Sequence, residues 1–442
     1  MINETASSAD DRPILRPVMP FEPTTESSVR SELRQMVMEV FTIEREPTGE
    51  PDLLMQRDGI LLFNPDGALT ATFEGRLLID SEAAYRQLDE AFATIDHMPY
   101  FREHDGRQVI HAVRGRIHPK PRSWHWNAFL FVATFLSVLL LGTEMALSEI
   151  AATNRPLAEQ LLANISGELW RGLPYALSLM LILGAHELGH YFAARYHKIA
   201  VTLPYFIPAP FFSFLGTFGA VIQQREPFRN RKSMFDIGAA GPLVGLVFAI
   251  PIVIIGLATS PTGPITPGGW VEGNSFIYAL SKTLVFGKFL PSDGIDVYMN
   301  QLTQAGWAGL LVTSLNLIPL GQLDGGHILY SLLGEKARRL YLPIVGLMIV
   351  LVFISQFWLL WALLLFLLGR IYVPPLDMIT PLDSRRRMLG LLALALFVLT
   401  FVPVPLTQVA SDGSIPLPQN TSTVWLQMTV GVMFVYGWLR RR

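Results

Sequence analysis

The sequence predicts an α-helical polytopic membrane protein with about eight transmembrane helices and a small N-terminal soluble α+β domain. Of its 442 residues, 51% are hydrophobic and only 16% are charged, whereas soluble proteins carry about 25% charged residues. The apolar residues gather in nearly continuous runs such as Phe129–Leu141, Ile344–Phe353 and Leu389–Val402. A helix needs about 20 mostly apolar residues to cross the hydrocarbon core of a bilayer, and several segments approach or reach that length.

Composition argues against several other classes of protein. The formal net charge is −2, so no basic surface for nucleic acid is expected. The chain has no cysteine, which rules out disulfide bonds and thiolate metal ligands. Residues 1–23 lack the basic and apolar regions of a secretory signal peptide. The first membrane span is therefore expected to act as its own insertion signal.

The N-terminal part is predicted to be soluble. Residues 1–28 are rich in Pro, Ser, Thr and acidic residues and are expected to form a disordered leader. Residues 29–120 are expected to form a cytoplasmic α+β domain without a recognisable chemical motif. Its predicted helices are Ser31–Ile43 and Ser81–Ile95, and its predicted strands are Leu53–Phe63, Ala68–Ile79 and Gln108–Ile117. The histidines in and just after this domain are expected to be solvated: His97, His104, His111, His118 and His125.

Residues 121–442 are predicted to form the transmembrane domain. The expected spans are Trp124–Leu147, Leu173–Tyr196, Phe235–Ala258, Leu302–Leu320, Leu342–Ser355, Phe357–Leu368, Leu389–Val404 and Val424–Leu439. The apolar stretch Val201–Ile222 is broken by proline and glycine, so it should dip into the membrane against protein or lie at its surface. Leu342–Leu368 is too long for one comfortable span and short for two.

The positions of the basic residues favour the count of eight spans. Lys and Arg cluster at residues 120–122, 195–198, 225–232, 336–339, 370–387 and 440–442. Basic residues beside membrane spans favour the cytoplasmic side, and all these clusters share one side only if Leu342–Leu368 forms two short spans. We therefore expect both termini to be cytoplasmic.

The second span contains the sequence His186-Glu187-Leu188-Gly189-His190. Positions i and i+4 lie on one face of a helix, so both imidazoles can reach one metal ion. Glu187 lies beside them and can take a proton from a metal-bound water, as in zinc hydrolases with this spacing. Three such polar residues inside an apolar run are costly unless they are paired or bind a metal. The alternative is a hydrogen-bonded polar cluster between helices.

A catalytic zinc site needs a third protein ligand, and Asp324 is the natural candidate. It lies at the end of an apolar span, where Pro319 and Gly321 break the helix. Asn316 is another costly polar group at this depth. Its amide could bind a substrate carbonyl or its developing oxyanion, or it could make a hydrogen bond between helices.

Together, His186–His190 and the segment Asn316–Gly326 resemble the site-2 protease family of intramembrane zinc metalloproteases. The later motif of that family contains Asn, Pro and Asp-Gly, here Asn316, Pro319, Asp324 and Gly325. The small-residue segment Phe235–Gly245 is also similar to the family. The catalytic core would be about 173–333. The eight spans, the soluble N-terminal domain and the lack of a PDZ insertion look most like the plastid and cyanobacterial branch.

The resemblance implies one zinc ion per chain, with His186, His190 and Asp324 as its ligands and Glu187 as the catalytic base. The expected enzyme is a zinc metalloendopeptidase that hydrolyses peptide bonds in or next to transmembrane segments, using a zinc-bound water that Glu187 activates. Its partners would be a transmembrane protein substrate and the lipid bilayer, without nucleic acid, and its oligomeric state stays open. Val201–Ile222 could pair as a strand with the unwound substrate, or it could be a loop that plugs the site.

Two other functions remain open at this point. A catalytically silent metal-binding scaffold would keep the same fold, and an ion-coupled transporter would suit the broken helices near Pro319 and Gly325. The chain is expected to be a multi-pass integral-membrane protein. A bacterial plasma membrane is favoured, and a thylakoid or plastid membrane would also fit.

Overall fold

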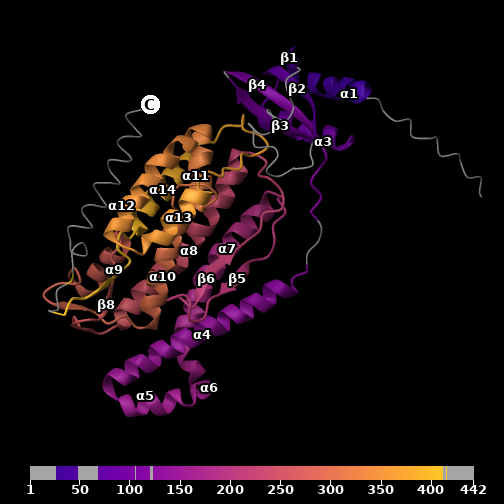
Figure 1. Ribbon diagram of the computed structural model, residues 1–442. Coiled ribbons are helices and arrows are strands. Elements are labelled where there is room, and N and C mark those ends of the chain that lie inside the picture. The colour runs from indigo at the N-terminus through magenta and orange to yellow at the C-terminus, as the bar shows by residue number, and fades with distance from the viewer. Residues whose placement is uncertain (1–25, 48–67, 105, 120–122, 412–414, 416–442) are drawn as a thin grey trace, which may run out of the picture.

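The protein is a mostly helical bundle with a small α+β domain at one end (Figure 1). The computed structural model describes residues 26–47, 68–104, 106–119, 123–411 and 415. Short helices α5 and α6 lie at the end of the molecule opposite the α+β domain (Figure 1). Their bounds are Arg155–Leu162 and Ile165–Glu168.

In the residues that the structure describes, the N-terminal domain consists of a four-stranded antiparallel sheet and two helices. Its elements are α1 (Glu26–Met38), β1 (Phe41–Arg45), β2 (Ala68–Leu77), α3 (Ser81–Ala93), β3 (His97–His104) and β4 (Arg107–Arg114). The strand order is β1-β2-β4-β3, so β3 is an edge strand. The apolar sides of α1, α3 and the sheet meet in a core that includes Leu33, Phe73, Leu88, Phe92 and Ile110. Burial of these apolar side chains stabilises the fold of the domain.

Several predictions for this domain need correction. The helix predicted over Ser31–Ile43 ends at Met38, and Phe41–Ile43 pair with β2 instead. Helix α1 also begins inside the predicted leader 1–28. Strand β3 was not predicted. Its Pro99 cannot donate a ladder hydrogen bond, but an edge strand tolerates proline. The predicted strand Leu53–Phe63 lies outside the described residues.

The predicted solvation of two histidines was wrong. His97 and His111 are buried in the sheet. Each has a threonine partner on β2. Thr70 Oγ1 lies 2.9 Å from His97 Nε2, and Thr72 Oγ1 lies 3.0 Å from His111 Nδ1. These hydrogen bonds offset the cost of removing the imidazoles from water.

Each of the first seven predicted spans overlaps a helix of the bundle. These helices are α4 (His125–Thr153), α7 (Leu173–Tyr196), α8 (Arg231–Thr259), α10 (Gln301–Asn316), α12 (Tyr341–Ile354), α13 (Trp358–Leu368) and α14 (Ser384–Thr400). The predicted span Leu302–Leu320 ends early, at Asn316, because the chain turns before Pro319. The segment Leu342–Leu368 forms two helices with a break at residues 355–357. The eighth predicted span, Val424–Leu439, lies outside the described residues.

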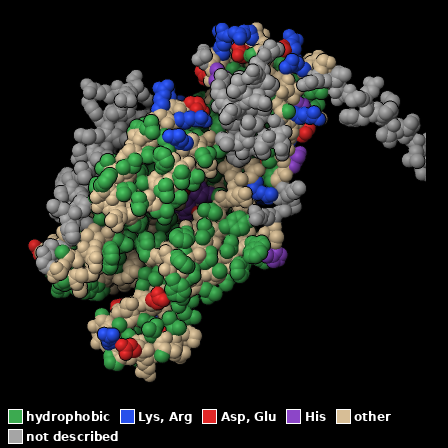
Figure 2. Space-filling model, viewed as in Figure 1, with side chains coloured by type: hydrophobic (Ala, Val, Ile, Leu, Met, Phe, Trp, Pro, Cys, Tyr) green, Lys and Arg blue, Asp and Glu red, His purple; other side chains and the backbone are tan. Residues whose placement is uncertain are grey.

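Within the described part of the chain, three helical stretches are long and apolar enough to cross a membrane: α4, α8 and Asp324–Ile354. The last comprises α11 (Asp324–Leu333), the 3-10 helix η3 (Gly334–Leu340) and α12. Figure 2 shows hydrophobic side chains over the flank of the bundle, and most Lys and Arg of this face at the end that carries the N-terminal domain. The chain is therefore a helical membrane protein with an N-terminal α+β domain, and the count of eight spans stays a prediction.

At the centre of the bundle, α7, α8 and α10 pack against one another. Leu179, Ala249 and Leu310 are among their fully or almost fully buried residues. Small side chains allow these helices to approach closely, as in other membrane bundles. The three helices together form the scaffold on which the polar residues of the second predicted span are held.

The broken apolar stretch Val201–Ile222 forms a β-hairpin. Its strands are β5 (Tyr205–Pro208) and β6 (Thr217–Val221). Helix α4 holds the hairpin: Asn127 Nδ2 donates to the Leu203 carbonyl at 2.8 Å, and Ser137 Oγ donates to the Gly216 carbonyl at 2.6 Å. Irregular backbone at this depth is therefore packed against protein, as an apolar surrounding requires.

The end of the bundle away from the N-terminal domain is closed by short elements. They are η2 (Leu169–Gly172), β7 (Thr262–Pro264), β8 (Trp270–Glu272), α9 (Phe276–Phe286), β9 (Ile295–Val297) and β10 (Leu406–Gln408). Strand β8 pairs with β10, and β7 pairs with β9. Lys282 of α9 is fully buried between the carboxylates of Glu272, at 2.8 Å, and Asp296, at 3.0 Å. Burial alone would lower the pKa of Lys282, but the two surrounding carboxylates outweigh it, and the pKa is raised.

Candidate metal centre

Helix α7 supplies three of the predicted site residues. His186, Glu187 and His190 are all buried in the middle of the bundle. His186 and His190 are four residues apart and lie on one face of the helix. Gly189 lies on the same helix, and a Cβ atom there would come within 2.8 Å of the Ala240 carbonyl oxygen of α8. The absence of a side chain at Gly189 lets α7 and α8 approach closely at this point.

Asp324 reaches the same place from the far side of a sharp turn. Helix α10 ends at Asn316, and α11 begins with Asp324 itself. A Cβ at Gly325 would lie 2.0 Å from the Leu317 carbonyl oxygen, so only glycine allows the chain to fold back this tightly. The carboxylate is thereby held at the N-terminus of a helix, where the helix dipole favours negative charge.

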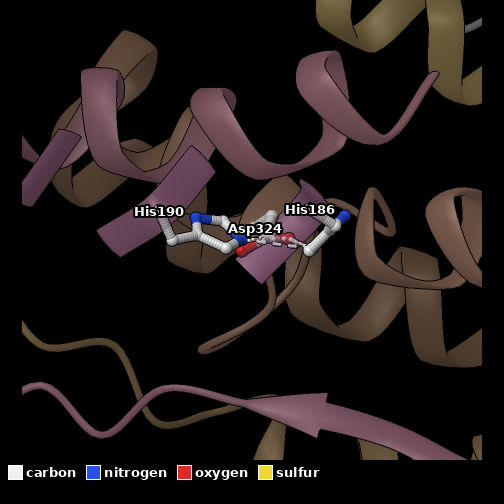
Figure 3. A group of neighbouring side chains, drawn as sticks. All are labelled: His186, His190 and Asp324. Atoms are coloured by element: carbon white, nitrogen blue, oxygen red, sulfur yellow. Dashed lines mark hydrogen bonds and ion pairs between the residues drawn. The ribbon is translucent and has the colours of Figure 1, made fainter. Parts of the chain in front are cut away.

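The three side chains converge on one another (Figure 3). Asp324 Oδ2 lies 3.2 Å from His186 Nε2 and 3.3 Å from His190 Nε2. The two Nε2 atoms are 3.1 Å apart. Among the residues that the structure describes, these three side chains form the group that could hold a metal ion, with ligand atoms all within 4.8 Å of one another.

These distances fit a metal ion. Zinc bound tetrahedrally at about 2.0–2.1 Å separates its nitrogen and oxygen ligands by roughly 3.3 Å, and the three observed separations are 3.1, 3.2 and 3.3 Å. Two imidazole nitrogens and a carboxylate oxygen are also ligands that zinc accepts. The group could therefore hold one zinc ion and leave a fourth position open.

Helix α8 shapes the other wall of the site. Its Ile237 carbonyl accepts a hydrogen bond from His190 Nδ1 at 2.7 Å, which turns the lone pair of Nε2 toward Asp324. A Cβ atom at Gly241 would lie 2.0 Å from His190 Nε2, and one at Gly245 would lie 3.3 Å from His186 Nδ1. The predicted small-residue segment Phe235–Gly245 thus provides the space in which the imidazoles fit.

Glu187 lies between the histidines in sequence and contacts the β-hairpin. Its carboxyl group lies near the backbone of Ile222, directly after β6, and near His190 and Asp324. Because Glu187 is not one of the three converging ligands, it is available for proton transfer.

Asn316 also reaches this site. Its Nδ2 atom lies 3.3 Å from His186 Nε2, on the side of the imidazole that faces Asp324. His327, three residues after Asp324, is not part of the group. Its Nε2 donates to the Gln322 carbonyl at 3.0 Å, and its ring packs against Phe228.

Sequence reasoning missed the residues that support the site from outside. Asp236 of α8 binds both His197, at the end of α7, and Arg386 of α14. Arg386 follows Asp236 by 150 positions. A single sequence offers no signal that would pair them, apart from the cost of a carboxylate near the start of an apolar span.

Fold and site together define a helical membrane protein with a buried group of side chains that could hold a metal ion, in the spacing typical of metallopeptidases. Residues 174–357 match the sequence model of peptidase family M50, the site-2 proteases. The chain therefore carries an M50 peptidase domain, which extends from α7 to the end of the break after α12. Helix α14 and the N-terminal domain lie outside the matched residues.

Curated relatives point to the same branch that the sequence features indicate. The chain is 35% identical over 238 residues to probable zinc metalloprotease EGY2, chloroplastic, of Arabidopsis thaliana, which covers 53% of this chain and 42% of the relative. It is 31% identical over 228 residues to probable zinc metalloprotease EGY1, chloroplastic, of Oryza sativa subsp. japonica, covering 48% and 38%. The chain thus spans less than half the length of these relatives. No solved structure matches it at a significant level.

Proposed function

We propose that the protein is a zinc metalloendopeptidase that cuts membrane proteins within or beside their transmembrane segments. The observation that carries this proposal is the convergence of His186, His190 and Asp324 at separations of 3.1–3.3 Å, with Glu187 next in sequence to a ligand. The M50 domain and the zinc metalloprotease relatives support it. The hydrophobic flank of the bundle supports a membrane location, where transmembrane substrates would reach the site through the bilayer.

Each residue of the site has a distinct role in this proposal. His186, His190 and Asp324 would hold the zinc ion. When bound, zinc acts as a Lewis acid on a carbonyl group and makes water more acidic. Glu187 takes a proton from the attacking water and later donates it to the leaving amine.

Asn316 has a role in transition-state stabilisation. In the observed arrangement its amide approaches His186 Nε2 at 3.3 Å, the same atom that would bind the ion. An imidazole nitrogen that binds a metal cannot also accept this hydrogen bond, so the Asn316 amide becomes free to donate elsewhere. We assign it to the developing oxyanion of the substrate, where one such donor is worth about 10²–10³ in rate.

The β5–β6 hairpin is the proposed substrate-docking element. A peptide bond in a helix is protected by its own hydrogen bonds, so the substrate must become extended before cleavage. An extended peptide can add to the edge of a sheet, and β6 leads directly to Ile222, which contacts Glu187. Pairing with this hairpin would therefore bring a substrate strand next to the catalytic base.

We further propose eight spans with both termini in the cytoplasm. The gathering of Lys and Arg at the end that carries the N-terminal domain supports this orientation. A bacterial plasma membrane is the favoured location. The chloroplastic relatives make a thylakoid or plastid membrane the alternative.

The proposal is tested by comparing the wild-type protein with Glu187→Gln in proteoliposomes, using a generic transmembrane substrate and quantifying zinc in both. Glu144→Gln, which alters a glutamate of α4 that lies outside the metal-binding group, is the matched control. We expect zinc in all three proteins and cleavage by wild type and Glu144→Gln only. A chelator should abolish cleavage, and added zinc should restore it.

Other outcomes favour the alternative functions. Zinc without cleavage by the wild type, across several substrates, would favour a catalytically silent scaffold. Folded wild-type protein that binds no zinc would contradict the ligand assignment and favour an ion-coupled transporter.

A further inference from the structure

Helix α14 makes an ion pair with α8 close to the metal centre. Arg386 Nε donates to Asp236 Oδ1 at 2.7 Å, and Nη2 donates to Oδ2 at 2.6 Å. This two-point contact fixes both the position and the orientation of the carboxylate. Both side chains are largely buried, with exposed fractions of 29% and 24%, so the contact is less screened than a surface ion pair.

The same carboxylate is bound to α7. His197, at the C-terminal end of α7, lies with Nε2 2.8 Å from Asp236 Oδ2. Asp236 therefore joins the ends of three helices: α7, which carries both histidine ligands, α8, and α14. The residue directly after Asp236 is Ile237, whose carbonyl orients His190. A shift of Asp236 would move the hydrogen-bond acceptor on which the orientation of His190 depends.

Helix α14 also packs against the elements around Asp324. Leu382 and Ala393 share a buried cluster with Phe235 and Ala239 of α8 and with Leu317 and Ile328 around the turn into α11. Asp383 caps the start of α14, with its Oδ1 accepting from the Arg386 backbone amide at 3.0 Å. This cap fixes the first turn of α14, from which the Arg386 side chain extends to Asp236.

Residues 376–378, the segment before α14, are bound by the N-terminal domain. The Phe101 amide of edge strand β3 donates to the Leu376 carbonyl at 2.9 Å, and the Met378 amide donates back to Phe101 at 3.1 Å. On its other side, the segment pairs with residues 228–230. The Leu376 amide donates to the Phe228 carbonyl at 2.8 Å, and the Asp377 amide donates to the Arg229 carbonyl at 2.8 Å. Residues 228–230 lead into α8.

We propose that Arg386 is a positioning residue for the metal centre. It holds Asp236, and through the α8 backbone it holds the Ile237 carbonyl in the place that aligns His190 for the ion. The N-terminal sheet binds residues 376–378. It thereby holds α14 and the start of α8 in the positions that the ion pair between Arg386 and Asp236 requires. The inference rests on the proposed function, because it concerns the same metal ion.

The test uses the full-length protein loaded with zinc in detergent, as wild type, Arg386→Gln, Arg386→Lys and the control Arg385→Gln. Arg385 is the exposed neighbour of Arg386 on α14, so its substitution removes the same charge from the same helix. The rate of zinc release to a chelating dye, the melting temperature of each protein and the visible spectrum of the Co²⁺-substituted form are measured.

Arg386→Gln should release zinc about 10- to 100-fold faster, the range typical of lost partners of metal ligands. Its melting temperature should fall as well, because the half-buried Asp236 carboxylate loses a partner. Zinc release and cobalt spectra are therefore compared well below the melting temperatures of all four proteins, and the cobalt spectrum of Arg386→Gln should be altered there. Arg386→Lys should fall between, because lysine restores the charge without the two-point contact. Arg385→Gln should match the wild type.

Equal zinc release and equal cobalt spectra in Arg386→Gln and Arg385→Gln would overturn the inference and leave Arg386 a structural contact only. If Arg386→Gln does not fold, the same comparison between Arg386→Lys and Arg385→Gln decides the question. Wild-type protein that binds neither zinc nor cobalt would overturn the proposed function itself, a result distinct from a failure of Arg386 alone.

Discussion

His190 Nδ1 lies 2.7 Å from the backbone carbonyl oxygen of Ile237. This hydrogen bond joins α7 to α8 and commits the other nitrogen of the ring, Nε2, to face Asp324 and His186. A carbonyl partner of this kind fixes the tautomer and orientation of a metal-binding histidine. The geometry of the site therefore depends on how closely α7 and α8 pack.

Gly241→Ala should disrupt the metal centre without altering any ligand. A Cβ atom at this position would lie 2.0 Å from His190 Nε2 and 2.5 Å from Cδ2, far inside contact distance. The imidazole would have to leave its position, so we expect zinc affinity to fall at least about 100-fold. Competition with a chelator of known affinity measures the change.

The matched control is Gly346→Ala in α12, where an added Cβ would meet no atom within 4 Å. It should keep the affinity of the wild type. Unchanged zinc binding in Gly241→Ala would mean that α8 does not form the wall of the site.

Asn316→Ala should lower kcat about 10²–10³-fold while the zinc content stays unchanged, because it removes a hydrogen-bond donor from the proposed oxyanion position. Asn316→Asp should be equally impaired, since a carboxylate of similar size cannot donate. Steady-state cleavage and zinc analysis on the same preparations separate the two effects. Loss of activity only in proportion to lost zinc would instead assign Asn316 to a hydrogen bond between helices that supports His186.

The ligand positions could be proposed from sequence because their geometry is local. The i, i+4 spacing of His186 and His190 places two imidazoles on one face of any helix. The Pro319 and Gly321 break similarly marks where a helix must stop before Asp324. The partners of these ligands could not be proposed, because Ile237 acts through its backbone and Arg386 meets Asp236 only in the folded bundle.

The fold shows the same difference between local features, which the sequence predicts, and long-range pairing, which it does not. Apolar runs indicated the position of α7 and α8, because a membrane helix needs no partner to reveal its length. In the N-terminal domain, Phe41–Ile43 continued the helical pattern of α1 but lie in β1, where pairing with β2 decides the conformation. His97 and His111 were expected to be solvated, although threonines on β2 satisfy their nitrogens inside the sheet.

Arg102→Gln should loosen the junction between the N-terminal domain and the bundle. Arg102 Nη1 donates to the carbonyls of Phe101, Pro375 and Leu376 at 2.8–2.9 Å. A hydrogen bond to a charged group contributes about 1.5–3 kcal/mol. We therefore expect the free energy of opening the junction between the N-terminal domain and the bundle to fall by about 2 kcal/mol. Hydrogen exchange of the Phe101 and Met378 amides, which both bond across this junction, measures it in the full-length protein.

Arg107→Gln serves as the control for the loss of charge. Arg107 lies on β4 and is about half exposed, and its ion pair with Glu74, among the described residues, is long at 3.8 Å. Its substitution should leave the exchange of these amides unchanged. Equal exchange in the two variants would show that the Arg102 guanidinium does not hold the junction.

His97 should make the stability of the N-terminal domain depend on pH. Burial, assisted by nearby Arg114, lowers the pKa of His97 below its ordinary value of 6.5. Above pH 6.5 the imidazole is neutral in both the folded and unfolded chain, and its contribution to stability is constant. Below pH 6.5 the unfolded chain binds a proton that the folded domain does not, so the free energy of unfolding falls as the pH drops toward the folded pKa.

The slope should be at most about 1.4 kcal/mol per pH unit below 6.5. Denaturant-dependent hydrogen exchange of β4 amides at pH 5.5 and 7.5, corrected for intrinsic exchange rates, measures it in the full-length protein. His97→Gln should remove this part of the pH dependence, whereas His118→Gln, at an exposed position, should retain it. If His97→Gln and His118→Gln show the same pH dependence, another group of the domain is responsible for it, and the protonation of His97 does not affect stability.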